Sequence, residues 1–94
     1  MKVAYHPEER RELLAAGGDE LHRKFEAEYL ASIKQILEDP LRWRIRGHTA
    51  RRFNLNRFPY YISYIVHGDT LWIVALALGG RKPFYWKGRT KDIG

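Results

Sequence analysis

Apolar residues recur every three or four positions between residues 21 and 37, a spacing that places them on one side of a helix. The stripe consists of Leu21, Phe25, Tyr29, Ile33, Ile36 and Leu37. We expect this helix to end at Asp39, because the residue before a proline avoids the helical region. A shorter helix is predicted over residues 7–16, where Pro7 suits the first helical position. The two helices should form an antiparallel hairpin joined at Gly17-Gly18.

Elsewhere the apolar positions follow the patterns of strands. Strands are expected at residues 1–5, 52–58, 60–67 and 70–78. Pro59 should end the second strand or place it at an edge of the sheet. Gly68-Asp69 is a two-residue hairpin signal between the third and fourth strands. The fourth strand is almost wholly apolar, which is typical of a strand that is central in its sheet or covered on both sides.

The order of elements is therefore strand, helix, helix, strand, strand, strand. In such a small sheet the helices can cover one face, so the predicted fold class is α+β: a small antiparallel sheet with an N-terminal helical hairpin packed on it. The chain of 94 residues is long enough for one domain, which we assign to residues 1–94.

The composition of the chain excludes several kinds of functional site. The chain has no cysteine, which excludes disulfides, thiolate metal sites and a cysteine nucleophile. The four histidines lie without ligand spacing, so we expect neither a metal nor another cofactor. The longest apolar run is far shorter than a membrane span of about 20 residues, and the N-terminus lacks the apolar run of a signal peptide. We expect a soluble, cytoplasmic protein.

Charge is divided unevenly along the chain. The formal net charge is +6 overall, but residues 1–40 carry −3 and residues 41–94 carry +9. The second segment also holds 10 of the 13 aromatic residues. A basic and aromatic segment favours a polyanion or an acidic protein as partner, whereas a merely solvated basic face is the alternative.

Three groups of residues could carry function. Arg51, Arg52 and Arg57 could form a basic strand face, whereas alternation places Phe53 in the core beside Leu55. In residues 83–86 three aromatics are adjacent, so at least one should be exposed or covered by a partner. His48, in an arginine-rich connection, could contact a phosphate, and His67 should lie exposed beside the hairpin turn. Glu8, Glu9 and Glu12 are interpreted as helix-dipole and solvated charges rather than catalytic carboxylates.

Several stretches resemble the RelE/ParE toxins of bacterial type II toxin–antitoxin systems. They are residues 5–13 (YHPEERREL), 38–43 (EDPLRW), 51–66 (RRFNLNRFPYYISYIV), 71–78 (LWIVALAL) and 81–86 (RKPFYW). Their order and spacing cover most of the chain. The resemblance implies a helical hairpin on an antiparallel sheet and a cognate antitoxin protein as partner in a hetero-oligomer. It also implies one of two targets, DNA gyrase for the ParE-like branch or mRNA on the ribosome for the RelE-like branch.

The RelE-like branch cleaves mRNA without a metal, and the resemblance carries its catalytic positions to Arg52, Arg81 and Tyr85. However, Asn54 and Tyr61 stand where that branch tends to carry Lys and Arg. A glycine, Gly79 or Gly80, also occupies the position where many relatives have a histidine. These departures favour the ParE-like, plasmid-stabilisation branch.

We therefore expect a toxin that inhibits growth by binding a macromolecular target, with a ribosome-dependent mRNA endonuclease and a non-toxic binding module as alternatives. The residues expected to bind the target or nucleic acid are Arg51, Arg52, Arg57, Arg81, Lys82, Trp86, Lys87 and Arg89. The antitoxin should cover the helical hairpin and the basic strands.

Overall fold

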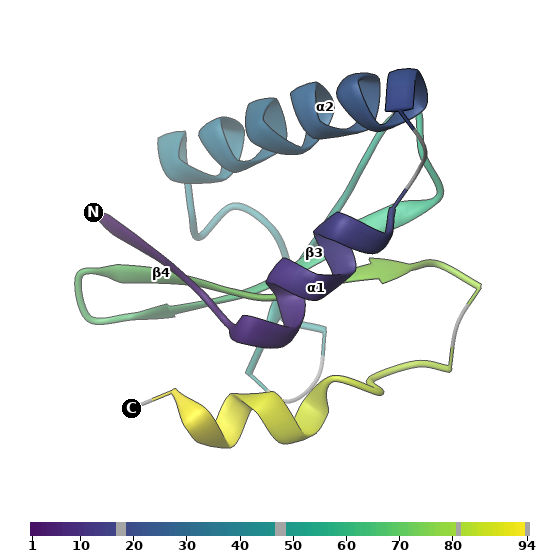
Figure 1. Ribbon diagram of the computed structural model, residues 1–94. Helices are drawn as coiled ribbons and strands as arrows, with labels where there is room; N and C mark the ends of the chain where they lie inside the picture. The colour runs from purple at the N-terminus through teal and green to yellow at the C-terminus, as the bar shows by residue number, and fades with distance from the viewer. Residues whose placement is uncertain (17–18, 47–48, 81, 94) are drawn as a thin grey trace.

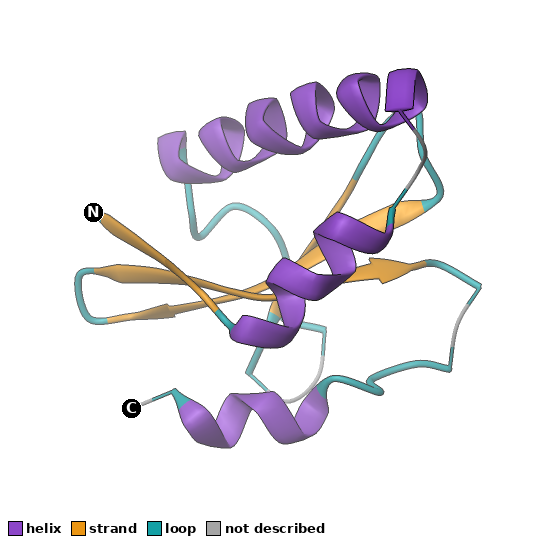
Figure 2. Cartoon of the chain, in the orientation of Figure 1, coloured by secondary structure: helices purple, strands orange, loops and turns teal. Residues whose placement is uncertain are grey.

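Two helices lie on one face of a four-stranded sheet, and the C-terminal segment lies on the other (Figures 1 and 2). The computed structural model describes residues 1–16, 19–46, 49–80 and 82–93. The elements are β1 (Lys2–Tyr5), α1 (Pro7–Ala15), α2 (Asp19–Glu38), β2 (Arg51–Asn54), β3 (Tyr60–His67), β4 (Thr70–Leu78) and the 3₁₀ helix η1 (Lys87–Asp92). The predicted glycine pair 17–18 lies outside the described residues. None of the described helices is both long and apolar enough to cross a membrane.

The sheet has the strand order β1-β4-β3-β2. The α+β fold class is confirmed, but the expectation of a wholly antiparallel sheet is wrong because β1 pairs with β4 in parallel, from Lys2 opposite Thr70 to Tyr5 opposite Ile73. A parallel pair requires a long crossover, and here that crossover contains both helices, β2 and β3. The predicted hairpin between β3 and β4 is present, with Gly68 at a φ of 60°.

β2 is shorter than predicted, because the chain leaves the sheet after Asn54 rather than at Pro59. The Leu55 backbone N–H donates to the Tyr60 carbonyl at 3.0 Å, which closes a loop. The Glu28 carboxylate on α2 accepts the next two backbone N–H groups, those of Asn56 at 2.8 Å and Arg57 at 3.1 Å. A helix side chain thus ends the strand, and no local pattern in the strand sequence could reveal it.

One core fills the space between the helices and the sheet. Its buried side chains are Leu13, Ala16, Phe25, Tyr29, Ile33, Ile36, Phe53, Leu55, Ile62, Tyr64, Leu71, Ile73 and Leu76. Phe25 meets the rings of Phe58 and Tyr60 edge to face, at centroid distances of 5.0 and 4.9 Å. The predicted stripe on α2 faces this core except at its first member, Leu21, which is exposed.

A second core lies on the opposite face of the sheet. Its buried members are Ala50, Tyr61, Val74, Ala75, Ala77, Trp86 and Ile93. A register shift between β3 and β4 places Ile73 opposite Tyr64 and Ala75 opposite Ser63, so Val74 is the extra residue of a β-bulge. The C-terminal segment, in which we predicted no regular element, forms η1 and supplies Trp86 and Ile93 to this core. The central strand β4 is therefore covered on both sides, as expected.

The helices meet at a buried carboxylate. Glu9 on α1 is 0% exposed; it accepts a short hydrogen bond from the Tyr29 hydroxyl on α2 and another from Arg10 Nε at 3.0 Å. Arg10 also donates to the Tyr29 hydroxyl at 2.9 Å. The expectation that Glu9 is a solvated charge is therefore wrong. Burial raises the pKa of Glu9 above 4.5, although its bonds to Tyr29 and Arg10 oppose the rise.

The raised pKa of Glu9 predicts a pH-dependent stability. A carboxyl whose folded-state pKa lies above its unfolded value stabilises the fold fully below that unfolded value, and the contribution is lost as pH rises through the folded pKa. The substitution Glu9→Gln keeps a carbonyl acceptor for Tyr29 but cannot ionise. We expect the free energy of unfolding of the natural protein to fall relative to that of E9Q as pH rises above 4.5. Urea unfolding from pH 4.5 to 8 measures this difference, with Glu8→Gln, at a more exposed site on the same helix, as control. A difference that stays constant with pH would contradict it.

Candidate functional site

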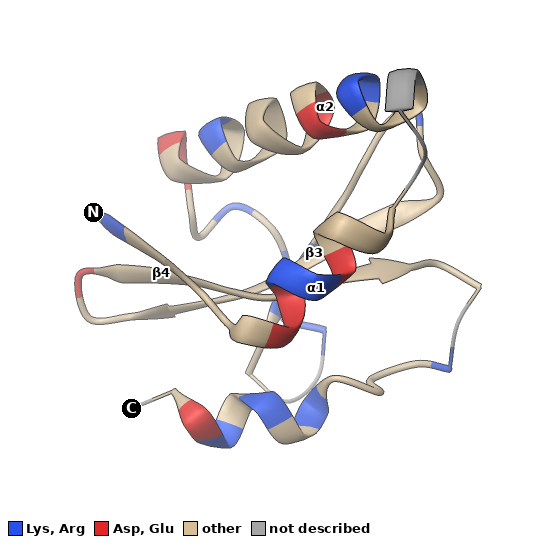
Figure 3. Cartoon of the chain, viewed as in Figure 1, with Lys and Arg blue, Asp and Glu red and all other residues tan. Residues whose placement is uncertain are grey.

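The arginines of the connection before β2 gather around Arg52 on β2. Figure 3 shows most acidic residues on α1 and α2, which carry Lys and Arg as well, whereas Lys and Arg predominate on the connection before β2 and on the C-terminal segment. Arg52 lines three hollows at once, one toward the connection, one toward β3 and the C-terminal segment, and one toward the β2–β3 loop. We call the described residues around these hollows the Arg52 surface.

The first hollow is a groove of about 650 Å³ between the connection and β2. Its lining residues are Gln35, Arg42, Trp43, Arg44, Arg46, Arg52, Phe53, Asn54 and Asn56. Within the described part of the chain none of the four arginines is in an ion pair, and no carboxylate lines the groove. Four uncompensated cations with three amide side chains make a site for a polyanion.

Local contacts hold Arg52 and its neighbour Arg51 in place. The Arg52 guanidinium stacks on the Tyr61 ring at 3.9 Å, and its Nε donates to Asn54 Oδ1 at 2.9 Å. Arg51 points the other way and donates to the Leu41 and Trp43 carbonyls at 3.3 and 2.7 Å, which fixes the connection against β2. Arg51 therefore has a structural contact that the sequence did not predict, and its expected role in binding stays a prediction.

The second hollow, which we call the Ser63 cavity, measures about 90 Å³. It is lined by Arg46, Ala50, Arg51, Arg52, Tyr61, Ser63, Phe84 and Trp86. Trp86 Nε1 donates to the Tyr61 hydroxyl at 3.0 Å, so the C-terminal segment closes one wall of the cavity. The Ser63 side chain is buried on the face of β3 that is turned away from α1 and α2, between the neighbouring strands β2 and β4.

Three residues of the C-terminal segment that we predicted to act on a target make structural contacts. Trp86 is 3% exposed and belongs to the outer core. The Tyr85 hydroxyl donates to the Glu12 carboxylate, and Arg89 donates to the same carboxylate at 2.9 and 3.1 Å. Glu12 also accepts the Leu76 N–H at 3.0 Å, so the expectation that it is a solvated charge is wrong.

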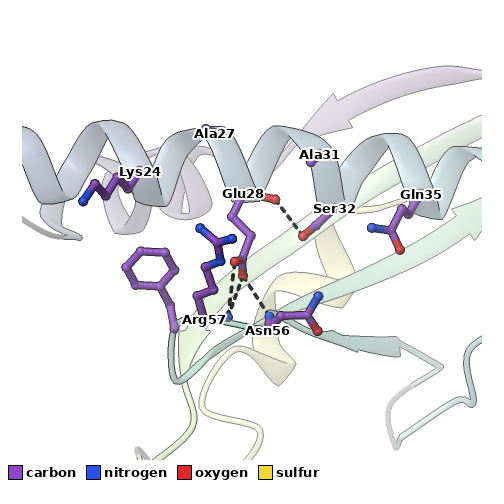
Figure 4. A pocket seen from close by; sticks show the side chains of 9 residues that line it. Lys24, Ala27, Glu28, Ala31, Ser32, Gln35, Asn56 and Arg57 are labelled. Carbon is purple, nitrogen blue, oxygen red and sulfur yellow. Dashed lines mark hydrogen bonds between the residues drawn. The ribbon is translucent and has the colours of Figure 1, made fainter.

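The remaining predicted residues are dispersed. Lys82 and Lys87 are exposed, and Arg57 lies in the β2–β3 loop beside α2. Figure 4 shows this region, a groove of about 470 Å³ in which Glu28 faces the loop while Lys24 and Gln35 extend along the helix. Arg81 and His48 lie outside the described residues, and His67 is exposed beside the turn as expected.

Sequence reasoning missed Arg42, Arg44 and Arg46 as site residues. A signal was present, since arginines at every second position of a non-helical segment can share one side. Ser63 carried no comparable signal, because a serine within an apolar strand is indistinguishable from a core residue until the facing side chains are known.

No known protein-family model matches this sequence, and a comparison with curated proteins finds no match either.

Proposed function

We propose that this protein is the toxin of a type II toxin–antitoxin system, similar to the ParE-like branch, which acts in the cytoplasm and is neutralised by a cognate antitoxin. It inhibits growth by binding a macromolecular target, with DNA gyrase as the leading candidate. The observation that carries the proposal is the Arg52 surface, a concentrated set of cations that are in no ion pair among the described residues.

Metal-independent RNA cleavage needs a base for the 2′-hydroxyl and an acid for the leaving oxygen. Tyr85, the residue that the resemblance offers for this role, lines none of the three hollows that Arg52 lines. Its hydroxyl proton is donated to Glu12, beside the Arg89 guanidinium. This arrangement supports binding over cleavage.

A ribosome-dependent mRNA endonuclease is the second candidate. It is favoured by one feature, the groove in which Arg42, Arg44 and Arg46 face amide side chains, because cations with amides suit a phosphate backbone and base edges.

Controlled expression in a bacterial host tests the proposal. We expect growth arrest with loss of gyrase supercoiling activity and without new ribosome-dependent mRNA ends. Arg52→Ala should weaken the arrest by about tenfold or more, since one charge-assisted contact contributes about that much to binding. Arg23→Ala, which removes an exposed arginine of α2 far from this surface in the sequence, should leave the arrest unchanged.

Other outcomes separate the alternatives. New mRNA ends with normal supercoiling would replace the proposal by the endonuclease. The absence of growth arrest, with the protein shown to be folded and expressed, would contradict a toxin of either kind and favour the non-toxic binding module.

A further inference from the structure

We propose that the Ser63 cavity is a binding site for a terminal phosphate monoester, the dianionic group present in free phosphate and at the phosphorylated end of a nucleic acid. This inference does not depend on the proposed toxin function, because it concerns an equilibrium that can be measured on the purified protein.

The first argument is an unpaired donor. The Ser63 hydroxyl is buried, and it has no hydrogen-bond partner among the described residues. Leaving a buried hydroxyl without a partner costs about 1–3 kcal/mol. Buried polar groups without partners are rare, and each one requires an explanation, of which a bound ion is one. An acceptor in the cavity would remove this cost.

The second argument is the neighbouring donors. The Tyr61 hydroxyl accepts a hydrogen bond from Trp86, and its own proton has no acceptor among the described residues. The Arg52 guanidinium lies over the Tyr61 ring at 3.9 Å and lines the cavity, and its Nε donates to Asn54 Oδ1 at 2.9 Å. Arg46 is held beside the cavity by its backbone N–H, which donates to the Ala50 carbonyl at 2.7 Å. The cavity therefore gathers two hydroxyls and two guanidiniums.

The third argument is charge and size. Among the described residues no carboxylate lines the cavity, and none of its three arginines is in an ion pair. Arg51 donates to backbone carbonyls, which leaves the guanidiniums of Arg46 and Arg52 for an anion. Its volume of about 90 Å³ is small beside the 300–1,000 Å³ of drug-sized ligand sites. A compact oxyanion matches this size and these donors, whereas a nucleoside does not fit.

The size and the charge of the cavity favour a phosphate monoester over a diester. A phosphodiester within a chain carries an ester substituent on both sides and needs two exits, whereas a terminal phosphate can enter with its free oxygens first. A monoester at neutral pH also carries up to two negative charges, which better match two guanidiniums.

Binding of inorganic phosphate, followed by calorimetry and by amide chemical shifts of β3 at low ionic strength, tests the site. We expect saturable one-to-one binding with shifts centred on Ser63, and no competition by dimethyl phosphate, a diester. Ser63→Ala should weaken binding by about tenfold, because it removes one hydrogen bond to a charged acceptor. It should not lower stability, since that hydroxyl has no partner among the described residues. Arg52→Gln should weaken phosphate binding at least as much. The substitution Arg23→Gln, at an exposed residue, should change the affinity less than about twofold, because it acts only through screened long-range electrostatics.

Two oligonucleotides that differ only in a 5′-phosphate distinguish the sources of the ligand. Competition by the 5′-phosphorylated strand alone identifies a nucleic-acid end, and competition by neither identifies free phosphate; both support the site. Equal binding of dimethyl phosphate, equal competition by the 5′-hydroxyl strand, or unchanged phosphate binding in S63A would overturn the proposal. So would an absence of saturable phosphate binding to the natural protein.

Discussion

Replacing Glu12 with alanine is expected to lower the free energy of unfolding by about 3 kcal/mol, because breaking a buried ion pair leaves its partner uncompensated. Glu12 and Arg89 are each 14% exposed in their side chains and meet at 2.9 Å. The same carboxylate accepts a hydrogen bond from the Leu76 backbone N–H, and Arg89 donates one to the Val74 carbonyl at 3.1 Å. The pair therefore satisfies backbone groups of β4 beyond the point where β1 ends.

Urea unfolding followed by circular dichroism measures this effect, and hydrogen exchange should show faster exchange in η1. Glu8→Ala is the matched control, one turn earlier on the same helix. Its carboxylate pairs with Arg11 on the surface at 2.8 Å, so its loss should cost no more than about 1 kcal/mol. Equal effects of the two substitutions would show that Glu12 does not anchor the C-terminal segment.

Trp86→Ala is the second substitution for which we expect a large effect. It should lower the free energy of unfolding by about 3–5 kcal/mol, as for other buried aromatic residues truncated to alanine. The indole is 3% exposed, and its N–H reaches the Tyr61 hydroxyl at 3.0 Å. The substitution opens the outer core and removes one wall of the Ser63 cavity. It should therefore reduce both stability and phosphate binding.

Phe84→Ala is the control for Trp86, because Phe84 lies two residues earlier and is 38% exposed. We expect it to cost about 1 kcal/mol, because the partly exposed ring loses its edge-to-face contact with Trp86 at 5.7 Å but opens no buried space. Thermal unfolding by circular dichroism compares the two variants. A Trp86→Ala protein of unchanged stability with weakened target binding would return Trp86 to the role of a target contact, as the sequence had suggested.

The elements were predictable wherever a local pattern determines them. The apolar stripe of α2, the apolar run of β4 and the turn at Gly68 each depend on residues close in the chain, and the structure confirms all three. The α+β class followed from their order. The parallel pairing of β1 with β4 did not, because strand order depends on how the crossover packs rather than on either strand's sequence.

The candidate site was predictable in part. Arg52 was identified correctly as a residue of the basic face, since alternation on β2 places it opposite Phe53. The structural contacts of Trp86, Arg89 and Tyr85 were not predictable, because their partners, Tyr61 and Glu12, lie more than twenty residues away in the chain. No periodicity connects such residues.

The sequence by itself determined a small α+β domain with an acidic helical part and a basic, aromatic part, because composition and periodicity are local properties. Tertiary structure alone decided which charges are buried and which are available. It enclosed Glu9 and Glu12 and bound Arg51 and Arg89 to partners. It left Arg46 and Arg52 beside a Ser63 hydroxyl that no described residue pairs with. The physical reason is that the free energy of a charge depends on its solvation and its neighbours, and both are set by packing between segments distant in the chain.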